Sequence, residues 1–247
     1  YETSNGRADY NAFSAQLQRR FRSGVSFNAV YTFSKAMDDS QTLGGRAPSA
    51  VPLAQDWQDL AAEWSLSPFN RTHTFNLTAQ FSPGQGLRGG ALLSGWKGAL
   101  AKDWTFQTTM QVASGLPLTP TVANLIDTGT GISNAVRADL TGSPIYAAPA
   151  GLYLNPAAFV APLAGQWGSA GRDIITGPML FSLNGSIGRV FRLPGERRSF
   201  DLRFDMTNVL NHVTFSSWNT TVNSAQFGLP TAANAMRSMQ ATLRFRF

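Results

Sequence analysis

The clearest feature of the sequence is the regular alternation of apolar and polar residues in seven separate runs. In the run from residue 25 to residue 33, every second position is apolar, including Val25, Phe27 and Tyr31, and mostly polar residues stand between. A period of two residues is typical of a β-strand with one apolar and one polar face. The seven runs predict strands near residues 11–22, 25–34, 72–82, 104–114, 180–192, 198–209 and 237–247.

The connections between these predicted strands are alternately short and long. The first, third and fifth connections are the short ones, and the first of them contains Ser23 and Gly24. The fifth contains Pro194 and Gly195, which suit the central positions of a tight turn. The long connections cover about residues 35–70, 116–178 and 211–236. We therefore expect an antiparallel sheet with short turns at one end and all long loops at the other.

The residues on the polar face indicate which environment the sheet occupies. Gln, Asn, Ser and Thr dominate this face, and only 14% of all residues are charged. Aromatic residues gather at strand ends, as in the two interfacial girdles of outer-membrane barrels, which also have short periplasmic turns and long external loops. Alternation alone also fits a soluble antiparallel sandwich. The combined features favour an all-β fold, an antiparallel transmembrane β-barrel.

The composition excludes several other classes of protein. Cysteine is absent, so disulfide scaffolds and thiolate metal sites are excluded, and 17 Phe, 6 Trp and 5 Tyr exclude intrinsic disorder. The net charge is +6. Nucleic-acid binding is not expected, because the Arg side chains and the aromatic residues lie mostly on opposite faces of the predicted strands. The Arg residues expected on the polar, lumenal face are Arg20, Arg22, Arg203, Arg244 and Arg246.

Four stretches of the chain carry a resemblance to a known family. They are residues 10–39 (YNAFSAQLQRRFRSGVSFNAVYTFSKAMDD), 60–84 (LAAEWSLSPFNRTHTFNLTAQFSPG), 154–178 (LNPAAFVAPLAGQWGSAGRDIITGP) and 200–215 (FDLRFDMTNVLNHVTF). Together they resemble the C-terminal barrel portion of a TonB-dependent outer-membrane transporter of the Oar-like type common in acidobacterial genomes. Asn70 departs from the family pattern, which has Asp at this position.

The resemblance implies a function, a location and a set of partners. The chain would supply about seven consecutive C-terminal strands of a larger barrel of about 22 strands in the bacterial outer membrane, without the family's plug and N-terminal periplasmic domain. It would take part in solute uptake driven by TonB–ExbB–ExbD through that plug. The lipid bilayer, lipopolysaccharide and the BAM assembly machinery would be its other partners. The alternative is a non-transporting outer-membrane or surface β-protein for binding or adhesion.

No group of residues in the sequence predicts catalysis, so we expect no enzyme, cofactor or metal. Residues 84–89 (GQGLRG) match a dinucleotide-binding pattern, but their neighbours are antiparallel strands rather than a βαβ unit. Ser94 and Lys97 match the SxxK pattern of penicillin-interacting enzymes without its partner motifs. His73 and His212 are the only histidines and lie far apart in the sequence.

Two weaker candidate sites remain. Acidic residues in the first long loop are candidate ligand contacts. Three of them follow the i, i+3, i+7 spacing of a short helix within residues 55–64. The favoured interpretation is that they form a solvated face of this loop. These candidates are Asp38, Asp39, Asp56, Asp59 and Glu63. At the chain end, Phe245 and Phe247 resemble the assembly signal that outer-membrane barrels present to the BAM machinery.

Overall fold

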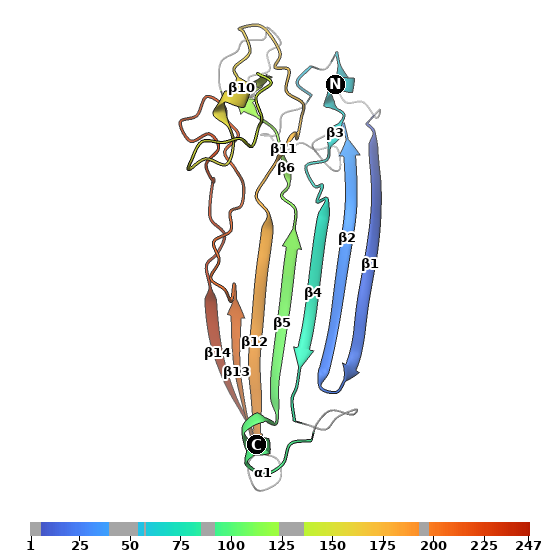
Figure 1. The fold of residues 1–247 in the computed structure, drawn as a ribbon, viewed down its shortest axis with the longest axis vertical. Coiled ribbons are helices and arrows are strands. Elements are labelled where there is room, and N and C mark those ends of the chain that lie inside the picture. Colours follow the sequence, from blue (N-terminus) through green and yellow to red (C-terminus); the bar gives the residue numbers. More distant parts are fainter. Residues whose placement is uncertain (1–5, 40–53, 57, 85–91, 124–135, 193–197) are drawn as a thin grey trace.

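The computed structural model describes residues 6–39, 54–56, 58–84, 92–123, 136–192 and 198–247. Most of its strand residues belong to one twisted antiparallel sheet, with the shorter connections, one of which contains a helix, at one end and the longer loops at the other (Figure 1). Its long strands are β1 (Ala8–Arg22), β2 (Val25–Asp38), β4 (His73–Phe81), β5 (Trp104–Ala113), β12 (Leu180–Arg192), β13 (Ser199–Thr207) and β14 (Ser238–Arg246). They are hydrogen-bonded in that order, and the short strand β3 (Ser65–Leu66) pairs with β2.

The sheet register places the alternating apolar residues on one face. In one row across the sheet, Leu17 lies opposite Ala29, followed by Leu77, Met110 and Leu183. Directly opposed residues of an antiparallel pair project to the same side. The all-β antiparallel fold predicted from the two-residue period is therefore confirmed.

This apolar face is not the inside of a sandwich. Phe13 and Leu17 on β1 are each 64% exposed, and Leu243 on β14 is 68% exposed. Within the described residues, the sheet forms a single layer whose path ends at β1 and β14. A continuous exposed apolar surface of this kind marks contact with an apolar environment.

Short polar side chains cover the opposite face. One row joins Gln18, Asn28, Thr78, Thr109 and Asn184 across five strands. Neighbouring rows are linked in places by side-chain hydrogen bonds, for example between the Gln16 amide and the Asn28 carbonyl oxygen at 2.7 Å. The two faces thus differ in chemistry along the whole width of the sheet.

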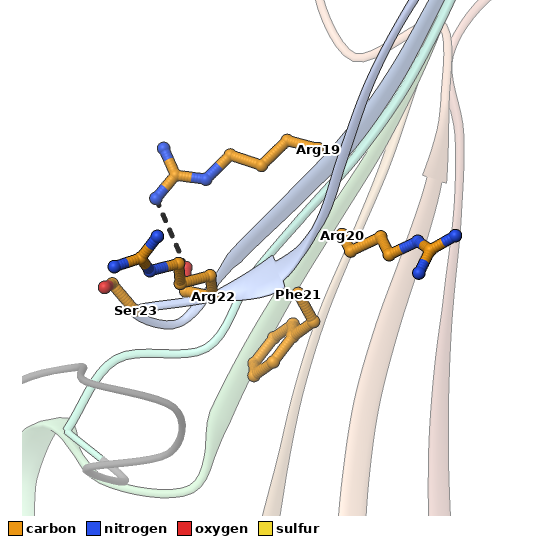
Figure 2. A pocket seen from close by; sticks show the side chains of 5 residues that line it. All are labelled: Arg19, Arg20, Phe21, Arg22 and Ser23. Atoms are coloured by element: carbon orange, nitrogen blue, oxygen red, sulfur yellow. Dashed lines mark hydrogen bonds between the residues drawn. The ribbon is translucent and has the colours of Figure 1, made fainter.

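A β-bulge near the first turn corrects the predicted direction of Arg22. Arg19 is opposite Phe27, but Arg22 is opposite Val25, so the chain advances by three residues along β1 over the length in which β2 advances by two. This extra residue moves Arg22 to the side of Arg19, the apolar face, because a bulge shifts the alternation. Figure 2 shows Arg19 and Arg22 on one side of the turn and Arg20 on the other. The lumenal position expected for Arg22 is therefore wrong.

The turn end of the sheet is tightly built. Ser23 and Gly24 both have positive φ angles, of 52° and 80°. A Cβ atom on Gly24 would lie 2.5 Å from the carbonyl oxygen of Ser82, so only glycine fits there. Between β4 and β5 the chain forms the short helix α1 (Gly95–Ala101). No helix in the described residues is long and apolar enough to cross a membrane.

At the loop end, the long connections fold into a separate layer. Its elements are the 3₁₀ helices η1 (Leu60–Glu63) and η3 (Pro156–Ala158) and the strands β6 (Pro117–Leu118), β7 (Thr121–Val122), β8 (Val136–Arg137), β9 (Asp139–Leu140), β10 (Phe159–Val160) and β11 (Ile175–Thr176). We call this layer, residues 54–72, 114–178 and 208–237 where described, the loop cap.

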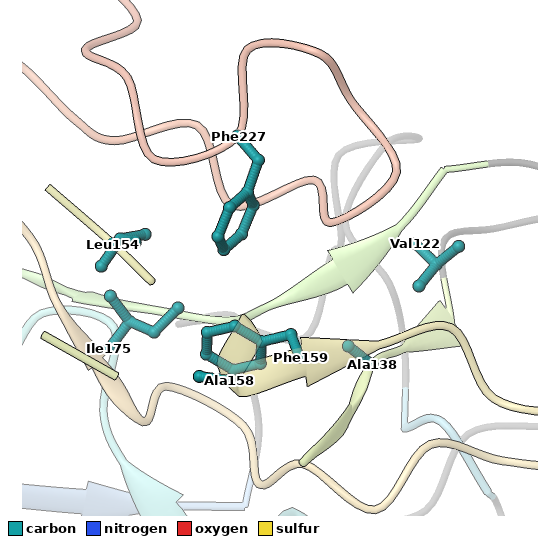
Figure 3. Packing of buried hydrophobic residues seen from close by; sticks show 7 residues of the cluster. All are labelled: Val122, Ala138, Leu154, Ala158, Phe159, Ile175 and Phe227. Carbon is teal, nitrogen blue, oxygen red and sulfur yellow. The ribbon is translucent and has the colours of Figure 1, made fainter. Parts of the chain in front are cut away.

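The main hydrophobic core of the described chain lies in the loop cap rather than on the sheet (Figure 3). Phe159 and Phe227 meet edge to face at a centroid distance of 5.7 Å, and Leu154 and Ile175 are almost fully buried. The complete cluster is Val122, Ala138, Leu154, Ala158, Phe159, Ile175 and Phe227. The loops are therefore packed against each other.

Candidate ligand-binding site at the loop end

A buried arginine of the loop cap forms hydrogen bonds and an ion pair with the end of β2. The Arg172 side chain is only 2% exposed. Its Nε donates to the Glu63 carbonyl oxygen at 3.1 Å, and its Nη2 donates to the Asp38 carbonyl oxygen at 2.5 Å. The same Nη2 forms an ion pair with the Asp38 carboxylate. Residues from two different loops are thus tied to the last residue of a long strand.

A second arginine completes this ionic cluster. Arg137 Nη1 donates to Glu63 Oε2 at 3.1 Å, and both side chains are at least nine-tenths buried. Gln55 bridges the same groups, since its backbone N–H donates to Glu63 Oε1 at 2.9 Å and its side-chain Oε1 accepts from the Arg137 backbone N–H at 2.8 Å. Gln55 Nε2 also donates to the Gly168 carbonyl oxygen. The carboxylate of Glu63 therefore has partners on both oxygens.

The cluster holds more negative than positive groups. The carboxylates of Asp38, Glu63 and Asp173 face the guanidinium groups of Arg137 and Arg172. Burial raises the pKa of Asp173 above its usual value, and the nearby charges of Asp38 and Glu63 raise it further. The hydrogen bond from Thr119 at 2.9 Å and the charge of Arg172 act in the opposite direction. Burial thus favours the protonated form of Asp173 within the cluster.

Glu63 does not lie on the solvated helix face that its spacing suggested. The helix is limited to the four residues of η1, and Glu63 is 4% exposed. Its burial depends on Arg137 and Arg172, which lie 74 and 109 positions further along the chain. A local spacing rule contains no information about partners at such distances.

The other acidic candidates have separate local roles and are not brought together. Both carboxylate oxygens of Asp39 accept from the backbone N–H of Arg7 at 2.9 Å. Asp59 accepts from the Ala62 N–H at the start of η1, and Asp56 accepts from the Gln58 N–H. Among the described residues, no group of three His, Asp or Glu side chains is arranged to hold a metal ion.

The remaining sequence motifs are also dispersed. His73 lies beside Tyr31, whose hydroxyl group is 2.8 Å from His73 Nδ1, whereas His212 packs against Phe181. Lys97 of the SxxK pattern lies over the ring of Trp96. Residues 85–89 of the glycine-rich motif lie outside the described residues.

Asn70, at the position where the resemblance led us to expect Asp, joins the loop cap to the sheet. It is 3% exposed, its Oδ1 accepts from the Ala36 N–H at 2.8 Å and its Nδ2 donates to Thr72 Oγ1 at 3.2 Å. An Asp side chain offers the same acceptor to Ala36, so the two residue types are compatible with this junction.

An aromatic group lies on the loop cap and was not predicted from the sequence. Tyr153 stacks on Trp218 with ring centroids 4.0 Å apart, and Phe215 meets both rings at 5.8 and 5.7 Å. Tyr153 is 45% exposed. The three residues come from two different long connections, so only the folded cap brings them together.

The two chain-end aromatics lie at the turn end of the sheet. Phe245 is opposite Phe200 on the apolar face, with ring centroids 4.9 Å apart. Phe247 follows the last residue of β14 and is 94% exposed. On the polar face of the same strands, Arg203 pairs with Asp205 and Arg246 with Asp201.

Comparison with known proteins agrees with this architecture. A family model described as an outer membrane beta barrel domain matches residues 1–240. Neither the search of curated proteins nor the search of solved structures gave a match. The exposed apolar face, the polar opposite face and the family match together place the protein in the bacterial outer membrane. This chain belongs to the outer membrane beta barrel domain family.

Proposed function

We propose that the chain forms the barrel wall and the external loops of a TonB-dependent receptor that takes up a solute. The observation that carries this proposal is the packed loop cap on a wall with a polar inner face. Binding sites of proteins are often built from loops held by a rigid scaffold. Arg172 binds both Glu63 in the cap and Asp38 at the end of β2, and these three residues come from three different stretches that resemble this transporter family.

The proposal orients the sheet in the membrane. Outer-membrane barrels have short periplasmic turns and long external loops, so the loop cap faces the outside and α1 faces the periplasm. The apolar face contacts lipid and the polar face lines the lumen. Unpaired edges at β1 and β14 would be unstable in lipid, and we therefore propose that further strands close the ring.

The solute would meet the loop cap first. The aromatic group of Tyr153, Phe215 and Trp218 offers ring faces and polar ring edges at this end of the barrel. The ionic cluster around Arg172 would hold the loops in place, since its charged groups are already occupied by one another. In this proposal the acidic residues act as supports for the binding loops.

Uptake measurements in cells test the proposal. Accumulation of labelled ferric siderophores, oligosaccharides and peptides is compared in wild-type cells, in cells lacking the gene and in cells depleted of TonB. We expect one class of solute to accumulate only when both the gene and TonB are present. Equal accumulation of every class in all three strains would overturn the proposal. Surface binding that depends on the gene but leads to no TonB-dependent uptake would instead support a role in adhesion.

A further inference from the structure

Helix α1 is attached to the apolar side of the sheet at the turn end. The carbonyl oxygen of Leu100, near the end of α1, accepts from Trp104 Nε1 at 2.9 Å and from Arg189 Nη1 at 3.2 Å. Trp104 and Arg189 are opposed residues of β5 and β12, in the row that also contains Leu202 on the apolar face. Two donors from this face therefore hold the C-terminal end of α1.

The helix presents an exposed apolar side. Trp96 and Leu100 are four residues apart and thus project in nearly the same direction. They are 73% and 66% exposed, and Leu92 just before the helix is 69% exposed. Lys97 follows Trp96, with its ammonium nitrogen 5.7 Å from the centre of the indole ring. The helix therefore combines exposed apolar side chains with a neighbouring cation.

Basic side chains at the same end also project from the apolar face. Arg19 lies on this face opposite Phe27, the bulge in β1 brings Arg22 to the same face, and both are exposed (Figure 2). Their turn lies against the end of β4, since the Ser82 N–H donates to the Gly24 carbonyl oxygen at 2.7 Å. A charged residue is costly at the centre of a lipid-facing surface, but it is favourable at the level of lipid headgroups.

Aromatic residues on the adjoining strands lie beside these basic residues at the turn end of the apolar face, since Phe81 and Phe106 share a row with Val25, which is opposite Arg22. Phe106 on β5 stacks with Phe81 on β4 at 6.1 Å and with Trp104 at 6.3 Å. The guanidinium group of Arg189 lies 5.5 Å from the Trp104 ring and 4.7 Å from the Phe191 ring. Aromatic residues of this kind concentrate at the headgroup level of membranes.

We propose that Arg19, Arg22 and Lys97, together with the exposed Trp96 and Leu100 of α1, form a surface that binds anionic phospholipid headgroups. We call these five residues the turn-end belt. The apolar side of α1 enters the boundary between headgroups and acyl chains, and the three cations contact lipid phosphates. The inference rests on the orientation given under the proposed function, which places the turn-end belt at the periplasmic leaflet.

Depth measurements test the position of α1. The chain has no cysteine, so the full-length protein, with any cysteine outside residues 1–247 replaced, accepts a single environment-sensitive fluorophore. Trp96→Cys and Leu100→Cys are labelled separately, with Leu77→Cys on the apolar face and Thr109→Cys on the polar face as controls. In vesicles, we expect shallow spin-labelled lipids to quench the labels at 96 and 100, deep ones to quench the label at 77, and neither to quench the label at 109.

The controls separate failure of this inference from failure of the barrel assignment. If deep quenchers act on position 77 while positions 96 and 100 remain in water, the inference is overturned and the membrane barrel stands. If position 77 is also unquenched, the assignment of the apolar face to lipid fails as well. The use of two labelled positions in α1 keeps the test valid when one of the variants does not insert.

Lipid selectivity tests the role of the cations. The fraction of motionally restricted lipid is measured by electron spin resonance with spin-labelled phosphatidylglycerol and with spin-labelled phosphatidylcholine. We expect the native protein to prefer the anionic lipid about three- to fivefold. The combined Arg19→Gln, Arg22→Gln and Lys97→Gln variant should lose most of this preference. The control Arg244→Gln with Arg246→Gln changes the polar face and should retain it. An unchanged preference in the triple variant would overturn the proposal.

Discussion

Arg172 donates from Nε to the carbonyl oxygen of Glu63 at 3.1 Å, although the two residues are 109 positions apart in the sequence. Both side chains are buried, and the Glu63 carboxylate also binds Arg137. A buried ion of this kind is stable only while its partners remain, because burial has removed the water molecules that would otherwise stabilise its charge. The loop cap therefore depends on a few charged contacts between distant segments.

Replacing Arg172 by Ala should destabilise the loop cap severely. The change leaves the Asp38 carboxylate without its ion-pair partner and removes the donor to the Glu63 carbonyl oxygen, and breaking a buried pair in this way costs about 3–5 kcal/mol. The expected result is much faster hydrogen exchange in residues 154–178, with exchange in the long strands nearly unchanged. Arg203→Gln is the control, since its ion pair with Asp205 lies exposed on the polar face of β13 and such pairs contribute little. Equal exchange in both variants would contradict the assigned role of Arg172.

The raised pKa of Asp173 predicts a pH dependence. Burial raises this pKa in the folded state, so the folded protein holds the proton more tightly than the unfolded chain. The contribution of Asp173 to stability is therefore greatest below its unfolded value of about 3.8 and falls as pH rises through the folded pKa. Asp173→Asn removes this titration and keeps an oxygen acceptor for Thr119.

The measurement is the free energy of unfolding in denaturant, compared between wild type and Asp173→Asn from pH 4 to pH 7. Relative to the variant, the wild-type protein should lose stability as pH increases. A wild-type protein that gains stability relative to the variant over this range would show that the carboxylate is stabilised in the cap, contrary to the expectation.

A charge introduced at the middle of the apolar face should cost far more than one on the polar face. Leu77 and Asn76 are neighbours near the centre of β4 and project to opposite sides. Leu77→Arg should destabilise the barrel by about 2–4 kcal/mol at the bilayer midplane, whereas Asn76→Arg remains in contact with water or polar groups. Unfolding of the full-length protein in lipid vesicles measures the difference. Similar costs at both positions would refute the assignment of the faces.

Removal of the terminal aromatic should reduce assembly but not uptake. Phe247 is 94% exposed and lies at the opposite end of the sheet from the loop cap (Figure 1). A free strand edge with an exposed aromatic residue suits docking on an assembly partner. Phe247→Ser is expected to lower the amount of folded protein in the outer membrane, with unchanged uptake per inserted molecule. The exposed loop residue Phe69 supplies the control variant Phe69→Ser, which should insert normally. Normal insertion of Phe247→Ser with reduced uptake would argue against the assembly role.

The long strands and their faces were predictable because they depend on a local pattern. Alternation with a period of two determines which side chains share a face, and Leu17, Leu77 and Leu183 lie in one row as the pattern indicated. The prediction failed at Arg22, where one extra residue in β1 reverses the alternation. Arg19 already interrupts the apolar series in the sequence, but this signal does not distinguish a bulge from a polar residue on the apolar face.

The candidate site was less predictable because its contacts are not local. Asp38 and Glu63 were identified as candidates from their charge, but their partners Arg137 and Arg172 were not. The stacking of Tyr153 on Trp218 likewise requires two long connections to meet. Periodicity provides no information about such pairings, which depend on how the loops pack over the sheet.

The long-range contact between Arg172 and Asp38 has a consequence for the order of folding. Each long strand of the sheet pairs with the next long strand along the chain, whereas this contact closes a segment of 134 positions. Distant contacts form late because the chain must first lose the entropy of the intervening segment. The sheet can therefore form by successive pairing of neighbouring strands, while the loop end becomes ordered only after Arg172 contacts Asp38 at the end of β2. We therefore expect a folding intermediate in which the long strands are paired but the long loops are still unpacked and open to cleavage by proteases.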